Sequence, residues 1–182
     1  IMSATNKALC ASMEQDMNIT MVLAEFDLEN KRMILANAGP HAYPLLVREK
    51  QIQPIQAKGL ALGMIPSIPY KTVTVDLQAG DLLLFMTDGI TEPRNAEGVM
   101  YEESGRLNEV LSSIPMEMST EEVVDMLIND VMDYTVDDEQ DDDITLVAVR
   151  VSITDQPVSG ETGLINVNTC SQEELVSLSG IG

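Results

Sequence analysis

The residue best placed for chemistry is Asp88, which stands at the end of an apolar stretch of the chain. It follows the run Leu82–Met86 after a single threonine, and Gly89 comes next. Glycine permits a sharp turn of the backbone at that point. A carboxylate held at the end of a rigid strand is well positioned to bind a hard cation. An isolated Asp-Gly pair also opens ordinary turns, so both interpretations of Asp88 remain open on this motif alone.

Two further acids, Asp142 and Asp143, end an acidic run and precede another apolar stretch. Adjacent carboxylates are costly to hold together without a counter-charge. Residues 107–149 contain thirteen acids and no Lys or Arg, so the neighbouring sequence supplies none. A bound cation is therefore an attractive explanation for this pair. For residues 137–141 a solvated acidic loop is the favoured interpretation, because charge runs are usually solvated.

The elements that must position these acids include several strands. Residues 82–86 are apolar at every position, which is typical of a central strand covered on both faces. Residues 71–77 alternate with period two, which predicts one buried and one solvated face. Further strands are expected at residues 18–27 and 33–38, joined as a hairpin, and at residues 43–48, 52–55 and 144–151.

Helices are predicted near the N-terminus, over residues 3–16, and between the last two strands. Residues 107–114 carry apolar side chains at helical spacing, and Ser119 with Glu122 forms a capping box that opens a second amphipathic helix. Strands interrupted by a block of two helices favour an antiparallel α+β fold.

The composition excludes several classes of protein. The chain has 182 residues, a formal net charge of -20 and 45% hydrophobic residues. This apolar content argues against intrinsic disorder, and the negative field repels nucleic acid from the main body. No apolar run approaches the ~20 residues of a membrane span. Cys10 and Cys170 share no motif, which fits a reducing cytoplasm rather than a disulfide framework or a zinc site.

Composition along the chain predicts one main domain and a short tail. The domain is expected over residues 1–151, a linker over residues 152–163 and a helical segment over residues 164–182. Because the chain begins with isoleucine and ends within an unfinished motif, we interpret it as an internal part of a longer protein.

Three stretches, in the order 36–47, 79–92 and 142–149, together resemble the C-terminal half of a bacterial enzyme family. That family is the PPM superfamily of metal-dependent serine/threonine protein phosphatases, in the subgroup of the sporulation stage II protein E phosphatase and the regulators of sigma-factor pathways. The middle stretch, AGDLLLFMTDGITE, is the most specific, and the segment GLALG at residues 59–63 fits between the first two.

The resemblance implies an antiparallel β-sandwich flanked by helices, with a binuclear Mn²⁺ or Mg²⁺ site at one end. Asp88 and Asp142 match metal ligands of the family, with Asp143 as a neighbour. In such a site the metals lower the pKa of a bridging water, which attacks phosphorus. The implied substrate is phosphoserine or phosphothreonine on a small regulatory protein, such as an anti-sigma-factor antagonist. The family's N-terminal motifs, which carry further ligands, do not occur in this sequence, so the resemblance implies about half of the metal site.

Two other residues near these motifs have alternative interpretations. His41 lies in a segment one residue longer than the family's common form, and it is interpreted either as a hydrogen-bonded loop residue or as a proton donor to the leaving group. Arg94 could bind phosphate bidentately. It could equally be an exposed arginine paired with Glu92 or Glu97.

The tail resembles the opening of a helix-hairpin-helix module, in which Gly180, Ile181 and Gly182 would offer backbone amides to a DNA phosphate. The tail has no Lys or Arg after Arg150, which argues against DNA binding by this chain. An ordinary C-terminal helix is the alternative.

Three hypotheses follow, in order of preference. The first is part of a cytoplasmic metal-dependent phosphatase that acts on a phosphorylated regulatory protein. The second is a non-catalytic phosphatase-like interaction module, and the third is a DNA-tethered protein. A homodimer is compatible with the first two.

Overall fold

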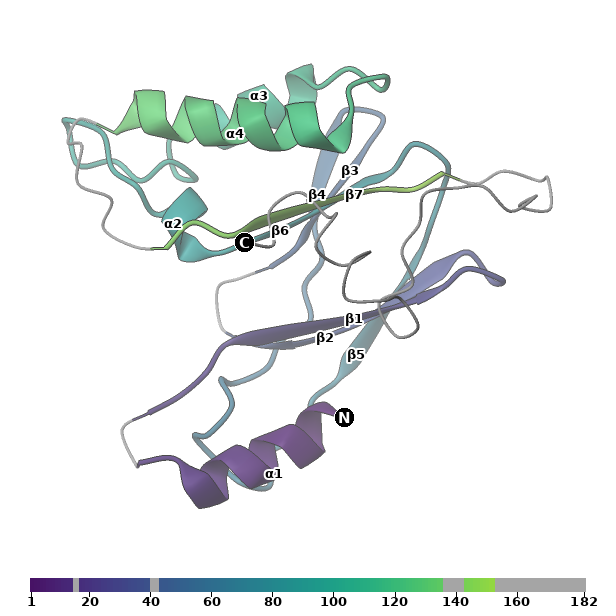
Figure 1. Cartoon of the computed structure of the whole chain (residues 1–182), viewed down its shortest axis with the longest axis vertical. Helices are drawn as coiled ribbons and strands as arrows, with labels where there is room; N and C mark the ends of the chain where they lie inside the picture. Colours follow the sequence, from purple (N-terminus) through teal and green to yellow (C-terminus); the bar gives the residue numbers. More distant parts are fainter. Residues whose placement is uncertain (15–16, 40–42, 136–142, 153–182) are drawn as a thin grey trace, which may run out of the picture. The chain divides into compact units, whose positions relative to one another are not determined.

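The structure is a computed structural model that describes residues 1–14, 17–39, 43–135 and 143–152. Its strands form two antiparallel sheets (Figure 1). The first sheet has the order β1–β2–β5, with β1 (Met21–Asp27), β2 (Arg32–Ala38) and β5 (Thr72–Asp76). The second has the order β4–β3–β6–β7, with β3 (Leu45–Arg48), β4 (Gln51–Pro54), β6 (Leu82–Met86) and β7 (Leu146–Arg150).

Four helices accompany the sheets in the described part of the chain: α1 (Met2–Ser12), α2 (Asp88–Thr91), α3 (Arg106–Ser113) and α4 (Thr120–Tyr134). Helix α1 packs on the first sheet through Met2 and Leu9. Helices α3 and α4 cover the second sheet on its outer face (Figure 1). The predicted antiparallel sandwich flanked by helices is therefore confirmed.

Strand β6 is buried on both faces, as its sequence predicts. Leu83 packs between the two sheets, against Met33 and Leu35 of β2. Leu82 and Leu84 point the other way, into a core shared with α3 and α4. All three leucines are fully buried, so β6 is the strand that joins the two hydrophobic layers.

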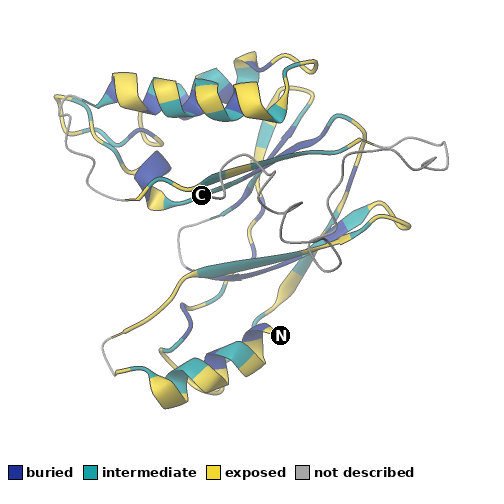
Figure 2. Cartoon of the chain, viewed as in Figure 1, coloured by how far each residue is buried: buried dark blue, intermediate teal, exposed yellow. Residues whose placement is uncertain are grey.

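The amphipathic pattern places α4 on that outer core. Val123, Leu127 and Val131 are buried, and Figure 2 shows buried and exposed stretches alternating along the helix. The predicted capping box is present: the Ser119 amide donates to Glu122 Oε2 at 2.8 Å, and the Glu122 amide donates to Ser119 Oγ at 3.2 Å. No helix in the described ranges has both the length and the apolar content to cross a membrane.

Contacts within the chain separate residues 1–152 from residues 153–182. The predicted tail and most of the predicted linker lie outside the described residues, so that division of the chain stays a prediction.

A buried ion pair fixes the turn between β5 and β6. The side chain of Asp81 is 1% exposed, and Arg48 of β3 grips it with two bonds of 2.8 and 2.6 Å. Arg48 also donates to the main-chain carbonyl of Asp76, and the Gln78 amide donates to the carboxylate of Asp81. The pair therefore joins three strands at the end of the sheets where β6 begins.

We predict that Arg48→Leu lowers the free energy of unfolding by about 3 kcal/mol, because it leaves the Asp81 carboxylate buried without its counter-charge. Urea denaturation at pH 7 measures the change. Arg32→Leu is the matched control, since Arg32 pairs with Asp27 on the surface and such pairs contribute about 0–1 kcal/mol. An equal loss of unfolding free energy in the two variants would contradict the view that the Arg48–Asp81 pair is a buried, stabilising ion pair.

Candidate metal centre

Asp88 is carried to the end of β6 by a short helix. Strand β6 ends at Met86, Thr87 has an extended backbone, and Asp88 is the first residue of α2. Gly89 and Ile90, the two residues that follow, are buried, and Ile90 packs into the outer core. Asp88 itself is exposed. A buried strand thus presents an exposed carboxylate at its end.

Gly89 does not make the sharp turn that the sequence predicts. It lies within α2 and is absent from the described glycines with positive φ. The chain changes direction instead where the extended Thr87 meets the helix. The conformational freedom of glycine is therefore not used at this position.

The second predicted group of acids is brought to the same place by strand register. In the β6–β7 ladder Met86 pairs with Leu146, and beyond it the Thr87 amide donates to the carbonyl of Thr145 at 3.0 Å. The Thr87 hydroxyl is also 3.1 Å from the carbonyl of Asp143. The backbone of Asp143 therefore lies beside the residue that precedes Asp88. Asp142 lies outside the described residues.

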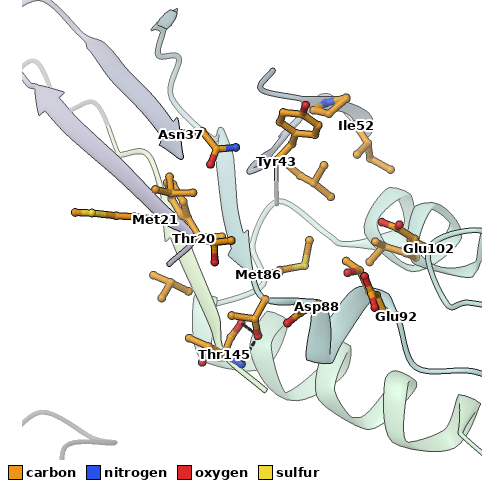
Figure 3. A pocket seen from close by; sticks show the side chains of 18 of the residues that line it. Thr20, Met21, Asn37, Tyr43, Ile52, Met86, Asp88, Glu92, Glu102 and Thr145 are labelled. Atoms are coloured by element: carbon orange, nitrogen blue, oxygen red, sulfur yellow. Dashed lines mark hydrogen bonds between the residues drawn. The ribbon is translucent and has the colours of Figure 1, made fainter. Parts of the chain in front are cut away.

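A pocket of about 720 Å³ opens beside Asp88. One side carries the carboxylates of Asp88, Glu92 and Glu102, and the other is formed by β1 and β2 through residues such as Met21 and Asn37 (Figure 3). Much of the remaining lining is apolar, from Leu45, Ile52, Phe85, Leu107 and Val147. The pocket therefore lies at the end of β6, with exposed acids on one side and mostly apolar side chains in the rest of its lining.

The donor set is of the kind that hard divalent cations prefer, because its charged groups are carboxylate oxygens. Within the described ranges, however, no group of three or more His, Cys, Asp or Glu side chains is arranged to hold a metal ion. These residues thus fit part of a ligand shell. A complete shell would draw on Asp142, on water or on other groups.

The remaining candidates are not part of this site as described. Arg94 is exposed, and its Nη1 donates to the carbonyl of Gly98 at 2.7 Å, which closes its own loop. It does not line the pocket. His41 lies outside the described residues, as do Gly180, Ile181 and Gly182, so their predicted roles stay predictions.

A polar cluster that the sequence did not predict ties the loop after α2 to α4. The hydroxyl of Tyr101, a fully buried residue, donates to Asp130 at 2.7 Å, and Arg106 donates to both oxygens of that carboxylate at 2.8 Å. The Arg106 guanidinium lowers the pKa of Asp130, whereas burial and the Asp130 bond raise the pKa of Tyr101. The amide of Glu102, next in the chain, donates to the carbonyl of Thr91, so this cluster supports one wall of the pocket.

A sandwich of two antiparallel sheets between helices, with acids gathered at the end of a central strand, has the fold of PPM-type phosphatase domains. The chain belongs to the Stage II sporulation protein E (SpoIIE) family, whose profile matches residues 1–152. This confirms the family resemblance of the main domain.

Particular relatives share this domain. Phosphoserine phosphatase RsbU of Bacillus subtilis (strain 168) is 25% identical over 151 residues, which cover 82% of this chain and 44% of that protein. The solved PP2C phosphatase domain of SpoIIE from Bacillus subtilis, with a fragment of its regulatory domain, is 26% identical with a TM-score of 0.67. That match covers 81% of this chain and 43% of the solved chain.

The fold is also that of the catalytic domain of the serine/threonine protein phosphatase PstP, solved with two manganese ions. That similarity has a TM-score of 0.61 at 19% identity and covers 83% of this chain and 68% of the solved one. The chain spans less than half the length of RsbU.

We predict that Asp130→Asn destabilises the protein by about 2 kcal/mol at pH 7, through the loss of charge-assisted bonds to Arg106. The pKa of Asp130 in the folded protein lies below the ordinary value of 3.8, which holds in the unfolded chain. The contribution of the carboxylate to stability is therefore fully present at pH values above 3.8. It disappears as the pH falls through the lowered pKa. Urea denaturation between pH 7 and pH 3 should therefore show the gap between wild type and variant closing toward low pH.

Asp125→Asn is the control for this titration, since Asp125 is an exposed acid on the same helix and makes no contact with Arg106 among the described interactions. Its stability should differ little from wild type across the range. A gap for Asp130→Asn that widens on acidification would contradict the assignment.

Proposed function

We propose that this chain forms part of a metal-dependent phosphatase that hydrolyses phosphoserine or phosphothreonine on a regulatory protein. The observation that carries the proposal is the β6–β7 register, which sets the backbone of Asp143 beside Thr87, the residue before the pocket-lining Asp88. Membership of the SpoIIE family and similarity to a protein named phosphoserine phosphatase support it.

In the proposed site, Asp88 and Asp142 hold divalent cations, with Asp143 as their neighbour. Mn²⁺ and Mg²⁺ both suit carboxylate ligands, and PstP, which has the same fold, is solved with two manganese ions. When bound, the metals supply Lewis acidity and a water of lowered pKa for attack on phosphorus.

The chain's own residues perform the remaining work. Helix α2 orients Asp88 toward the pocket, and the β6–β7 ladder sets the distance to the second acid-bearing segment. Glu92 and Glu102 line the pocket and add negative charge. Because this charge would repel a phosphate, binding of the dianion depends on prior binding of cations.

Finer expectations belong to the same proposal. The substrate would be a phosphorylated regulatory protein such as an anti-sigma-factor antagonist. The protein would act in the cytoplasm. The tail, residues 164–182, would be the start of a helix-hairpin-helix module joined by the linker 152–163. The similarity to RsbU supports the choice of substrate class, while the assignment of the tail rests on its sequence alone.

Calorimetric titration with Mn²⁺ tests the proposed centre. Wild type should bind with defined stoichiometry, and Asp88→Asn and Asp142→Asn should each weaken binding more than about tenfold, because each removes a charged ligand. Asp125→Asn is the matched control: Asp125 is an exposed acid on α4 outside the pocket lining, and its loss should leave affinity unchanged.

Binding that survives in both Asp88→Asn and Asp142→Asn would assign Mn²⁺ to the acidic run instead. The phosphatase-like domain would then be better explained as a non-catalytic interaction module.

A further inference from the structure

Thr87 takes no part in the proposed chemistry. Its hydroxyl, however, connects the segment that carries Asp88 to the segment that carries Asp143. Its Oγ1 is 3.0 Å from the amide nitrogen of Thr145 and 3.1 Å from the carbonyl oxygen of Asp143. A third contact, to the carbonyl of Thr145, is longer at 3.4 Å. Thr87 itself is the residue between β6 and Asp88.

The direction of each bond follows from the chemistry of a hydroxyl group. A hydroxyl donates one hydrogen bond and accepts others. It accepts from the Thr145 N–H, which has no alternative orientation. The Thr145 carbonyl already accepts from the Thr87 amide at 3.0 Å, so the hydroxyl proton is best directed to the nearer carbonyl of Asp143. Thr87 thus binds the main chain of the opposite segment through three hydrogen bonds.

Apolar burial supports this junction through Ile144, which packs against the outer core. Asp143 and Thr145 are both exposed, and Ile144 between them is only half-buried. The last strand pair of the ladder is Met86 with Leu146. Beyond this pair, the Thr87 amide still donates to the carbonyl of Thr145. The Thr87 side chain adds hydrogen bonds to the main chain of Thr145 and Asp143, in the segment just before β7. Without the hydroxyl, the Thr145 amide would lose its acceptor and the carbonyl of Asp143 would lose the hydrogen bond from Thr87.

We propose that Thr87 is a positioning residue of the metal centre: its hydroxyl holds the main chain of Asp143 beside Thr87, one residue before Asp88, so that carboxylates from both segments reach one cation. This inference rests on the proposed function, because it assigns the purpose of the bridge to metal binding. Thr87 is not itself a ligand in this assignment, since its oxygen is engaged with the backbone of the opposite segment.

Three variants of the full chain separate the hydroxyl from the rest of the side chain. Thr87→Val keeps the shape and removes the hydroxyl, whereas Thr87→Ser keeps the hydroxyl and removes a methyl group. Thr74→Val is the control, because Thr74 is an exposed threonine of β5 outside the pocket lining. Thermal unfolding by circular dichroism establishes that each variant is folded.

Amide hydrogen exchange of the metal-free protein, measured by NMR, tests the bridge directly. In Thr87→Val the Thr145 amide should exchange about tenfold faster than in wild type, because its hydrogen-bond acceptor is gone. Thr87→Ser and Thr74→Val should retain the wild-type rate. An unchanged rate in Thr87→Val would show that the hydroxyl does not hold this segment, and would overturn the inference.

Calorimetric titration with Mn²⁺ tests the purpose of the bridge. Thr87→Val should bind about tenfold more weakly, which is the usual scale for a group that orients a ligand, and Thr87→Ser should stay within about twofold of wild type. Wild-type affinity in Thr87→Val, or an equal loss in Thr74→Val, would overturn the positioning role.

The two failures are distinguishable. If wild type and Asp88→Asn bind Mn²⁺ alike, the proposed metal centre is wrong and the positioning role fails with it. If Asp88→Asn alone loses binding and Thr87→Val does not, the centre stands and only the inference about Thr87 is wrong.

Discussion

Strand β6 has to be covered on both of its faces, and most of the described structure follows from that requirement. Leu83 needs the first sheet on one side, and Leu82 and Leu84 need α3 and α4 on the other. Each fully buried leucine contributes about 1.5–3 kcal/mol, so the strand is held firmly from both directions. Asp88 inherits this rigidity because it follows β6 after one residue. A carboxylate on a well-fixed support needs little ordering when it binds a cation.

Local sequence patterns predict the elements of this fold well, since their causes lie within a few residues. The continuous apolar run predicts a central β6, the spacing of Val123, Leu127 and Val131 predicts the buried face of α4, and Ser119 with Glu122 predicts its start. Helix α2 escapes prediction because four residues are too few to show a period. The Arg106–Asp130 pair escapes it because its members lie 24 residues apart in sequence. Only the tertiary packing of α4 brings them together.

The candidate site also has features that local sequence predicts and features that depend on tertiary structure. Residue type and position at strand ends are enough to nominate Asp88, Asp142 and Asp143 as candidates, whereas the proximity of their two segments depends on which strands are neighbours and in which register. Pairing of β6 with β7, fixed by Met86 opposite Leu146, supplies that information. Thr87 illustrates the difference most clearly. In sequence it is one threonine among many, and its significance comes from a partner 58 residues away.

The outer edge of β7 bears on how the protein behaves in concentrated solution. In the described part of the chain β7 is the last strand of its sheet, and Val147 is 50% exposed. A strand edge of this kind can recruit a strand from another molecule and start aggregation. The formal charge of -20 opposes such encounters by mutual repulsion between molecules. Colloidal stability should therefore decline with added salt or acid, both of which weaken that repulsion while leaving the exposed edge in place.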